Sequence, residues 1–143
     1  MSEKIQFLTE SDELKMIIEF DGYQHYSSSR TIFNDNRKQK IAKERGYATV
    51  RILYFVQLKK DAIRHFLGID QDDYNIYPHG VIDKKCLLPA DFCELGIDRF
   101  KREMNSLPVS IQRDVIGSLQ VKEKELGDRR LVLPPGLDFL MLN

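Results

Sequence analysis

The fold is decided by the stretch "KMIIEFDGYQHY", which runs from Lys15 to Tyr26. Its first half is apolar on both faces, which is typical of a central strand that is covered on two sides. Glu19 and Asp21 stand at the end of this strand. Because side chains two residues apart in a strand point to the same face, we expect the two carboxylates to lie side by side.

Two neighbouring carboxylates in an apolar setting repel each other unless a positive charge lies between them. Burying unpaired ionised carboxylates is costly, and a divalent cation such as Mg²⁺, which prefers oxygen ligands, removes that cost. Gly22 would leave room for a substrate backbone, and His25 would bring a titratable group to the same edge. The alternatives are ordinary ones: a carboxylate that pairs with a surface cation, and a histidine that donates to a backbone carbonyl.

The segments on either side of this strand predict a mixed sheet. The residues after it are good helix formers, Ser27 to Ser29 offer N-cap oxygens, and Gly46 is a natural helix end. A helix that joins two strands in this way favours a crossover connection and a parallel pair. The expected elements are a strand at 4–8, a strand at 14–20, a helix at 31–45, a strand at 47–55 and a helix at 58–68.

Beyond Gly68 the sequence is first polar and rich in turns, and then predicts an αα-hairpin. The first helix ends at Pro108, Ser110 is expected to cap the second, and Gly127 ends it. The apolar positions that repeat at helical spacing are Ile97, Phe100, Met104 and Leu107 in the first helix, and Ile111, Val115 and Leu119 in the second.

The last residues, "LVLPPGLDFLMLN" at 131–143, are too apolar to stay in water, so we expect them to dock, either on the chain itself or across a dimer interface. The predicted organisation is an α/β core at 1–70 and a helical extension at 71–143, packed on the core or on a dimer partner. A homodimer is therefore plausible.

Composition limits the class of protein. The chain has 143 residues, of which 42% are hydrophobic and 31% are charged, as in an ordinary globular domain. No apolar run reaches the roughly 18 residues of a membrane helix, and the polar start is not a signal peptide, so a cytoplasmic location with no membrane contact is expected. Cys86 and Cys93 lack metal-finger spacing and are expected to be reduced thiols.

The net charge is zero, but its distribution is uneven. From Arg30 to Arg64 there are ten Lys or Arg residues against three acids, a local balance of +7. Such a stretch is compatible with contacts to phosphates, and also with a solvated helix face.

Two segments together carry a resemblance to a known family. "IIEFDGYQHY" and "FNDNRKQKIAKERGYATVRILYF" resemble the core of the restriction-endonuclease-like (PD-(D/E)XK) nuclease superfamily, most closely the branch of the very short patch repair endonucleases. The resemblance covers about Lys4 to Leu67. The positions that match the motifs of that branch are Glu19, Asp21, Gly22 and His25 on the strand, Asp35 and Lys38 on the helix, and Gly46, Arg51 and Ile52 around the next strand.

The resemblance implies an α/β fold with a mixed central sheet and flanking helices, and a Mg²⁺-dependent endonuclease of the restriction or repair type that hydrolyses DNA, with Mn²⁺ able to substitute. Glu19 and Asp21 would be the metal ligands. Asp21 takes a position where many members have lysine, so Lys38 would supply the lysine. His25 would be a general base or a phosphate contact. The alternative for Lys38 is an exposed lysine that pairs with Asp35.

Four cations on the predicted helix are candidates for contacts with the DNA backbone, which fix position without reading sequence. They are Arg37, Lys40, Lys43 and Arg45.

One position departs from the family pattern. The family has an aspartate on the preceding strand, and here that position falls near Gln6 or Phe7, with Glu10 the nearest acid that could take its place. A second interpretation therefore stays open, in which the chain is a catalytically impaired nuclease-fold module that binds DNA or a partner protein. A third is an unrelated α/β domain.

Overall fold

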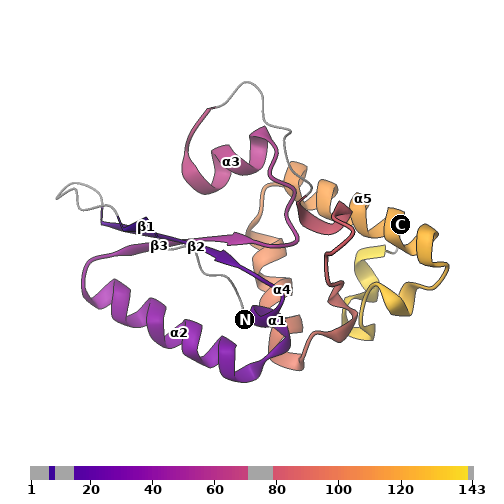
Figure 1. Ribbon diagram of the computed structural model, residues 1–143, viewed down its shortest axis with the longest axis horizontal. Coiled ribbons are helices and arrows are strands. Elements are labelled where there is room, and N and C mark those ends of the chain that lie inside the picture. Colours follow the sequence, from indigo (N-terminus) through magenta and orange to yellow (C-terminus); the bar gives the residue numbers. More distant parts are fainter. Residues whose placement is uncertain (1–6, 9–14, 71–78, 142–143) are drawn as a thin grey trace.

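A small mixed sheet lies at one end of the molecule (Figure 1). The computed structural model describes residues 7–8, 15–70 and 79–141. Within them the sheet has the order β1-β2-β3, in which β1 pairs antiparallel and β3 parallel with the central β2. The strands are β1 (Phe7–Leu8), β2 (Met16–Asp21) and β3 (Ala48–Leu53). The predicted mixed α/β architecture is thus confirmed.

The connection from β2 to β3 is the predicted helix, α2 (Ser29–Glu44), which lies against one face of the sheet (Figure 1). It starts where the Oγ atom of Ser28 accepts a hydrogen bond from the backbone N–H of Thr31 at 3.3 Å. It ends before Gly46, whose φ of +83° belongs to the left-handed region. These local signals are why the sequence locates this helix well.

A one-turn helix that the sequence does not predict, α1 (Gln24–Ser27), lies between β2 and α2. The sequence gives no sign of this helix, because four residues are too few to show a helical period. Both His25 and Tyr26 are fully buried in this turn. Burial by the rest of the chain, rather than helix propensity, therefore accounts for the turn.

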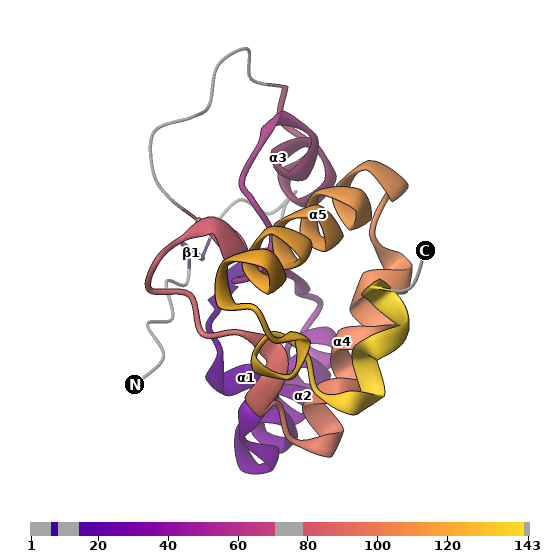
Figure 2. The same cartoon turned by 90° about the vertical axis from the view of Figure 1, so that its right-hand side faces the viewer.

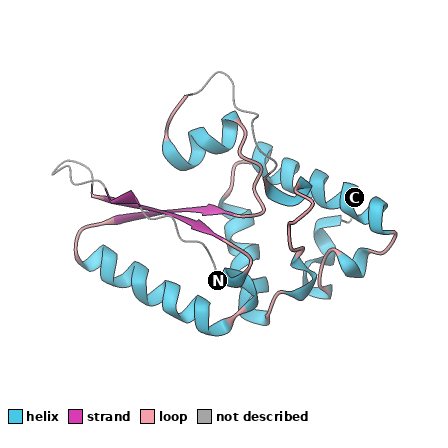
Figure 3. Ribbon diagram, in the orientation of Figure 1, coloured by secondary structure: helices cyan, strands magenta, loops and turns pink. Residues whose placement is uncertain are grey.

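Three further helices follow along the chain. They are α3 (Lys60–Leu67), α4 (Glu94–Ser106) and α5 (Val109–Leu126). Short 3-10 turns at Gly80–Ile82, Pro89–Asp91, Arg129–Leu131 and Pro135–Met141 connect and follow them. In Figure 3 the small sheet lies between α2 on one face and α3 on the other, and the remaining helices gather beyond one of its ends.

The predicted helical pair is present, but it is not a side-by-side hairpin. Helix α4 packs against α1 and α2, whereas α5 packs against α3, and the two diverge after Ser106 (Figure 2). The N-cap of α5 is Pro108 and not Ser110, which lies inside the first turn. Proline fits this place because the first turn of a helix needs no N–H partner.

Helix α4 approaches the one-turn helix unusually closely. A Cβ atom on Gly96 would overlap the backbone carbonyl of Tyr26, so only glycine fits. This contact brings the first turn of α4 against α1, which follows β2.

One hydrophobic core joins the two halves of the chain. Its buried cluster includes Tyr26 and Phe55 from the first half, and Phe100 and Leu119 from the second. The C-terminal apolar segment docks into this same cluster through Val132, Leu133, Leu137 and Met141. Because the segment is covered by its own chain, the argument from it to a dimer no longer holds, and the homodimer stays a prediction.

Among the described residues, no helix has both the length and the apolar character that a membrane crossing requires.

Candidate functional site

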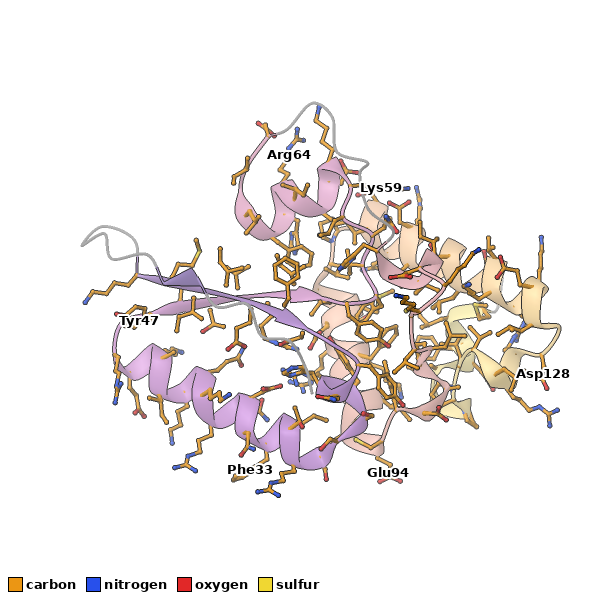
Figure 4. The ribbon with its side chains drawn as sticks, in the orientation of Figure 1. Phe33, Tyr47, Lys59, Arg64, Glu94 and Asp128 are labelled. Atoms are coloured by element: carbon orange, nitrogen blue, oxygen red, sulfur yellow. The ribbon has the colours of Figure 1, made fainter. Side chains whose placement is uncertain are left out.

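A pocket opens between α2 and the sheet, and it brings two predicted site residues together. Its volume is about 410 Å³. Glu19 enters it from β2 and Lys38 from α2. The other lining residues are Ile17, Gln39, Ile41, Ala42, Arg45, Tyr47 and Thr49. Tyr47 lies at the end of the sheet beside the C-terminal end of α2 (Figure 4). A carboxylate and a lysine that are distant in the sequence thus share one opening, which we call the Glu19 pocket.

Asp21 shares a strand face with Glu19 but lies in a fully buried ionic group. The Nε2 atom of His25 is 3.4 Å from Oδ1 of Asp21. On the other side of the ring, Nδ1 of His25 is hydrogen-bonded to Oδ2 of Asp35. The exposed fractions of Asp21, His25 and Asp35 are 1%, 0% and 3%. His25 therefore bridges a carboxylate from β2 and one from α2.

Asp35 is held in its ionised form. Burial alone would raise its pKa, but hydrogen bonds from His25 and Arg99 outweigh burial and lower the pKa. Nη1 of Arg99 donates to Oδ2 of Asp35 at 2.9 Å and to the backbone carbonyl of His25 at 3.0 Å. Since an ionised carboxylate only accepts, Nδ1 of His25 is the donor to Asp35, and Nε2 is the nitrogen that faces Asp21.

Asp21 has the opposite electrostatic balance. Burial raises its pKa, and the positive charge of Arg51 opposes this shift without cancelling it. Nε of Arg51, the register partner of Glu19 on β3, donates to Oδ2 of Asp21. Burial therefore disfavours the ionised form of Asp21 more than the charge of Arg51 favours it.

Glu103 of α4 closes the group from the other half of the chain. Its Oε1 atom accepts from Nη1 of Arg51 at 2.8 Å and from Nε of Arg99 at 3.0 Å. Its Oε2 atom accepts from the hydroxyl of Tyr26 at 2.6 Å, and the pKa of Tyr26 is raised by burial and by this carboxylate. We call these residues the ionic network, in which Arg51 and Glu103 are partly buried and the others buried: Asp21, His25, Tyr26, Asp35, Arg51, Arg99 and Glu103.

The carboxylates of the network pair with its two arginines. Asp21 pairs with Arg51, Asp35 with Arg99, and Glu103 with both. His25 is a further partner of Asp21 and Asp35, and it carries a charge only when it is protonated. Three buried atoms of the network, Oδ1 of Asp21, Nε2 of His25 and Nη2 of Arg51, have no hydrogen-bond partner within the described part of the chain. Burying polar atoms without partners is unfavourable, so a cation or a proton would be bound between Asp21 and His25.

Asp21, His25 and Asp35 also form the group of described residues that lie close enough together to hold a metal ion, since one ligand atom of each lies within 4.8 Å of the others. Glu19 is not a member of this group. Of the two predicted metal ligands, Glu19 therefore lines an open pocket and Asp21 lies in a buried cluster. That both bind the same cation stays a prediction.

The four predicted DNA contacts are all exposed. Arg37, Lys40 and Lys43 project from α2, and Arg45 lies at its C-cap and lines the Glu19 pocket. Gln6 and Glu10, the candidates for the missing acidic position, lie outside the described residues. Phe7, the other candidate position, lies in β1 opposite Ile18.

Sequence reasoning did not find Tyr26, Arg99 or Glu103. The signal was absent, because the i,i+4 pair Arg99 and Glu103 reads as an ordinary exposed ion pair on a helix surface. The two cysteines are free, and burial raises the pKa of the Cys86 thiol to about 11, so it is not an activated nucleophile.

No protein-family model matches this chain, and neither the curated proteins nor the solved structures contain a match to it.

Proposed function

We propose that the protein is an endonuclease that depends on a divalent cation and hydrolyses phosphodiester bonds in DNA. The observation that carries the proposal is the meeting of Glu19 and Lys38 in one pocket. A carboxylate at a strand end and a lysine from the crossover helix are what the sequence motifs require. Arg45 also lines that pocket, and the other cations of α2 are exposed and have the charge that a phosphate backbone needs.

The donor set fits a divalent cation. Glu19 and Asp21 offer oxygen ligands on one strand face, and Oδ1 of Asp21 has no hydrogen-bond partner in the described structure. Mg²⁺ is the first choice with carboxylates, and Mn²⁺ is compatible with both a carboxylate and an imidazole such as His25. When bound, such a cation lowers the pKa of a coordinated water and stabilises charge on the scissile phosphate.

The protein's own groups divide the remaining tasks. The ammonium group of Lys38 would hold a phosphate oxygen or orient the attacking water in the Glu19 pocket. Arg45, on the same pocket, would contact the neighbouring phosphate. The hydrogen bond from His25 to Asp35 fixes the imidazole ring beside Asp21, and the one from Arg51 to Asp21 fixes the Asp21 carboxylate.

One observation favours a second candidate, the impaired nuclease-fold module that binds DNA or a partner protein. Oδ2 of Asp21 already accepts a hydrogen bond from Arg51, whose cation supplies part of the charge that a metal would otherwise provide. In that case the Glu19 pocket and the basic helix would bind nucleic acid without cutting it.

Cleavage of supercoiled plasmid with Mg²⁺ or Mn²⁺ distinguishes the two candidates. We expect nicking by the wild type, and its loss by at least a hundredfold in Glu19→Gln and in Lys38→Met. Glu44→Gln and Lys84→Met are the matched controls, since both side chains are exposed and neither lines the Glu19 pocket. If the protein binds DNA but shows no metal-dependent cleavage, the nuclease is ruled out and the second candidate, a module that binds DNA, is favoured.

A further inference from the structure

The outward face of α2 carries an aromatic side chain that the fold does not need. Phe33 is 66% exposed. The buried residues of this helix, Ile32, Asp35 and Ala42, belong to its other side, and Phe33 points away from the sheet (Figure 4). A single exposed apolar side chain is common on protein surfaces and needs no occupant by itself. The charges around Phe33 are what set it apart.

Cations surround this ring at helical spacing. Arg30 precedes it by three residues, and Arg37 and Lys40 follow it by four and seven, so all three lie on the same side of the helix as Phe33. All three are exposed. The only exposed acid in α2 is Glu44, in its last turn, since Asp35 is buried. We call Arg30, Phe33, Arg37 and Lys40 the Phe33 face.

We propose that the Phe33 face binds a single strand of nucleic acid, with a base stacked on Phe33 and phosphates on the surrounding cations. An aromatic ring in a cationic surface is how proteins hold unpaired strands without reading their sequence. The charge complementarity selects this occupant, because one ring amid three cations is a poor match for an apolar protein surface. A duplex keeps its base faces stacked internally and offers the ring no partner.

The same row of residues leads to the Glu19 pocket. Phe33, Arg37 and Ile41 follow one another at intervals of four residues, and Ile41 lines that pocket. From Phe33 to Ile41 the helix rises about 12 Å. A strand on the Phe33 face would thus reach the pocket within a few nucleotides. Together with the proposed function, this arrangement assigns the enzyme a DNA substrate that has an unpaired segment. Binding of a single strand to the Phe33 face does not itself require cleavage.

The test uses a tryptophan reporter and no metal. The chain contains no tryptophan, so Phe33→Trp places a single indole on the Phe33 face. Phe139→Trp is the matched control, since Phe139 is 53% exposed beside a cation, Lys101, on a different part of the surface. Both variants are titrated with oligothymidylate, with its duplex form and with an acidic peptide of equal charge, in EDTA.

We expect oligothymidylate to quench the Phe33→Trp fluorescence, and to leave the Phe139→Trp fluorescence unchanged. Phe33→Leu and Phe33→Ala should weaken binding of the single strand about tenfold, and Phe33→Trp should retain it. Wild-type affinity in Phe33→Leu would overturn the stacking role, because leucine keeps the apolar area without the ring face. Equal quenching by the acidic peptide or by the duplex would overturn the single-strand assignment.

These results do not depend on the outcome of the cleavage assay. Quenching without plasmid cleavage would leave the inference standing and remove the nuclease. Plasmid cleavage without quenching of the Phe33→Trp fluorescence would support the nuclease and overturn the single-strand site on the Phe33 face.

Discussion

Glu103 on α4 accepts a hydrogen bond at 2.8 Å from Arg51 on β3, although 52 residues separate them. Arg51 in turn donates to Asp21 at the end of β2. The helical second half of the chain thus completes the surroundings of the conspicuous carboxylate of the first half. The contact follows from the close approach of Gly96 to Tyr26, which sets the position of α4. The second half is therefore part of the candidate site.

Glu103→Gln should destabilise the protein. The substitution leaves the partly buried Arg51 and the buried Arg99 opposite fewer negative charges, and the loss of a hydrogen-bonded partner in such a place costs about 1–3 kcal/mol. Urea unfolding without metal measures the loss. Glu125→Gln is the control, because Glu125 is 56% exposed in its pair with Lys122 and should change stability by less than about 1 kcal/mol. Equal stability of the two variants would show that the network contributes nothing.

Asp21→Asn and Asp35→Asn should have opposite effects on the stability of the metal-free protein. Burial raises the pKa of Asp21, so the folded state disfavours its charge, and a neutral amide there should leave stability unchanged or raise it. The pKa of Asp35 is lowered despite its burial, so the amide should cost about 1–3 kcal/mol there. A clear drop in Tm for Asp21→Asn without metal would contradict both this balance and the cation site.

The same two groups determine the acid response. Protonated Asp21 stabilises the fold below the ordinary pKa of 3.8, and this contribution is lost as the pH rises through its higher folded pKa. Stabilisation by Asp35 is fully present above 3.8 and is lost as the pH falls toward its lower folded pKa. Asp35→Asn should therefore flatten the fall in Tm below about pH 4. Asp21→Asn should act at higher pH, where it removes the stabilisation that protonation of Asp21 adds as the pH falls toward about 4. Scanning calorimetry from pH 7 to pH 2 checks both directions.

The sequence predicted what depends on local signals. The Ser28 cap and Gly46 locate α2, and the parallel pairing of β2 with β3 follows from the crossover. The same reasoning failed where tertiary contacts decide. The one-turn helix at His25 had no period, and the direction of α5 relative to α4 depends on packing against α3.

The sequence likewise indicated one part of the candidate site and missed another. The resemblance to a nuclease family suggested that Lys38 acts beside Glu19, and both residues line the Glu19 pocket, while their roles stay predictions. The roles of Arg99 and Glu103 could not be predicted, because nothing in an i,i+4 charge pair indicates that a distant strand will bury it.

Gly96→Ala and Gly117→Ala should shift stability in opposite directions. The new methyl group at position 96 would overlap the carbonyl of Tyr26 and force α4 away, at a cost of about 1–3 kcal/mol or more. At position 117, in the middle of α5, nothing lies within 4 Å, so alanine should gain up to about 1 kcal/mol from helix propensity. Denaturant titration of the two variants compares them directly. A stable Gly96→Ala protein would show that α4 can shift without loss.

Gly22→Ala should fold normally and cut poorly. A Cβ atom at position 22 meets nothing within 4 Å, so the change in stability should stay within about 0.5 kcal/mol. The open space is what a substrate backbone beside Asp21 would need, and a methyl group there should reduce metal-dependent plasmid nicking about tenfold or more. Circular dichroism melts confirm the fold, and nicking rates at saturating Mn²⁺ measure the effect. A fully active Gly22→Ala enzyme would mean that the substrate approaches from the Lys38 side of the Glu19 pocket and does not pass over Gly22.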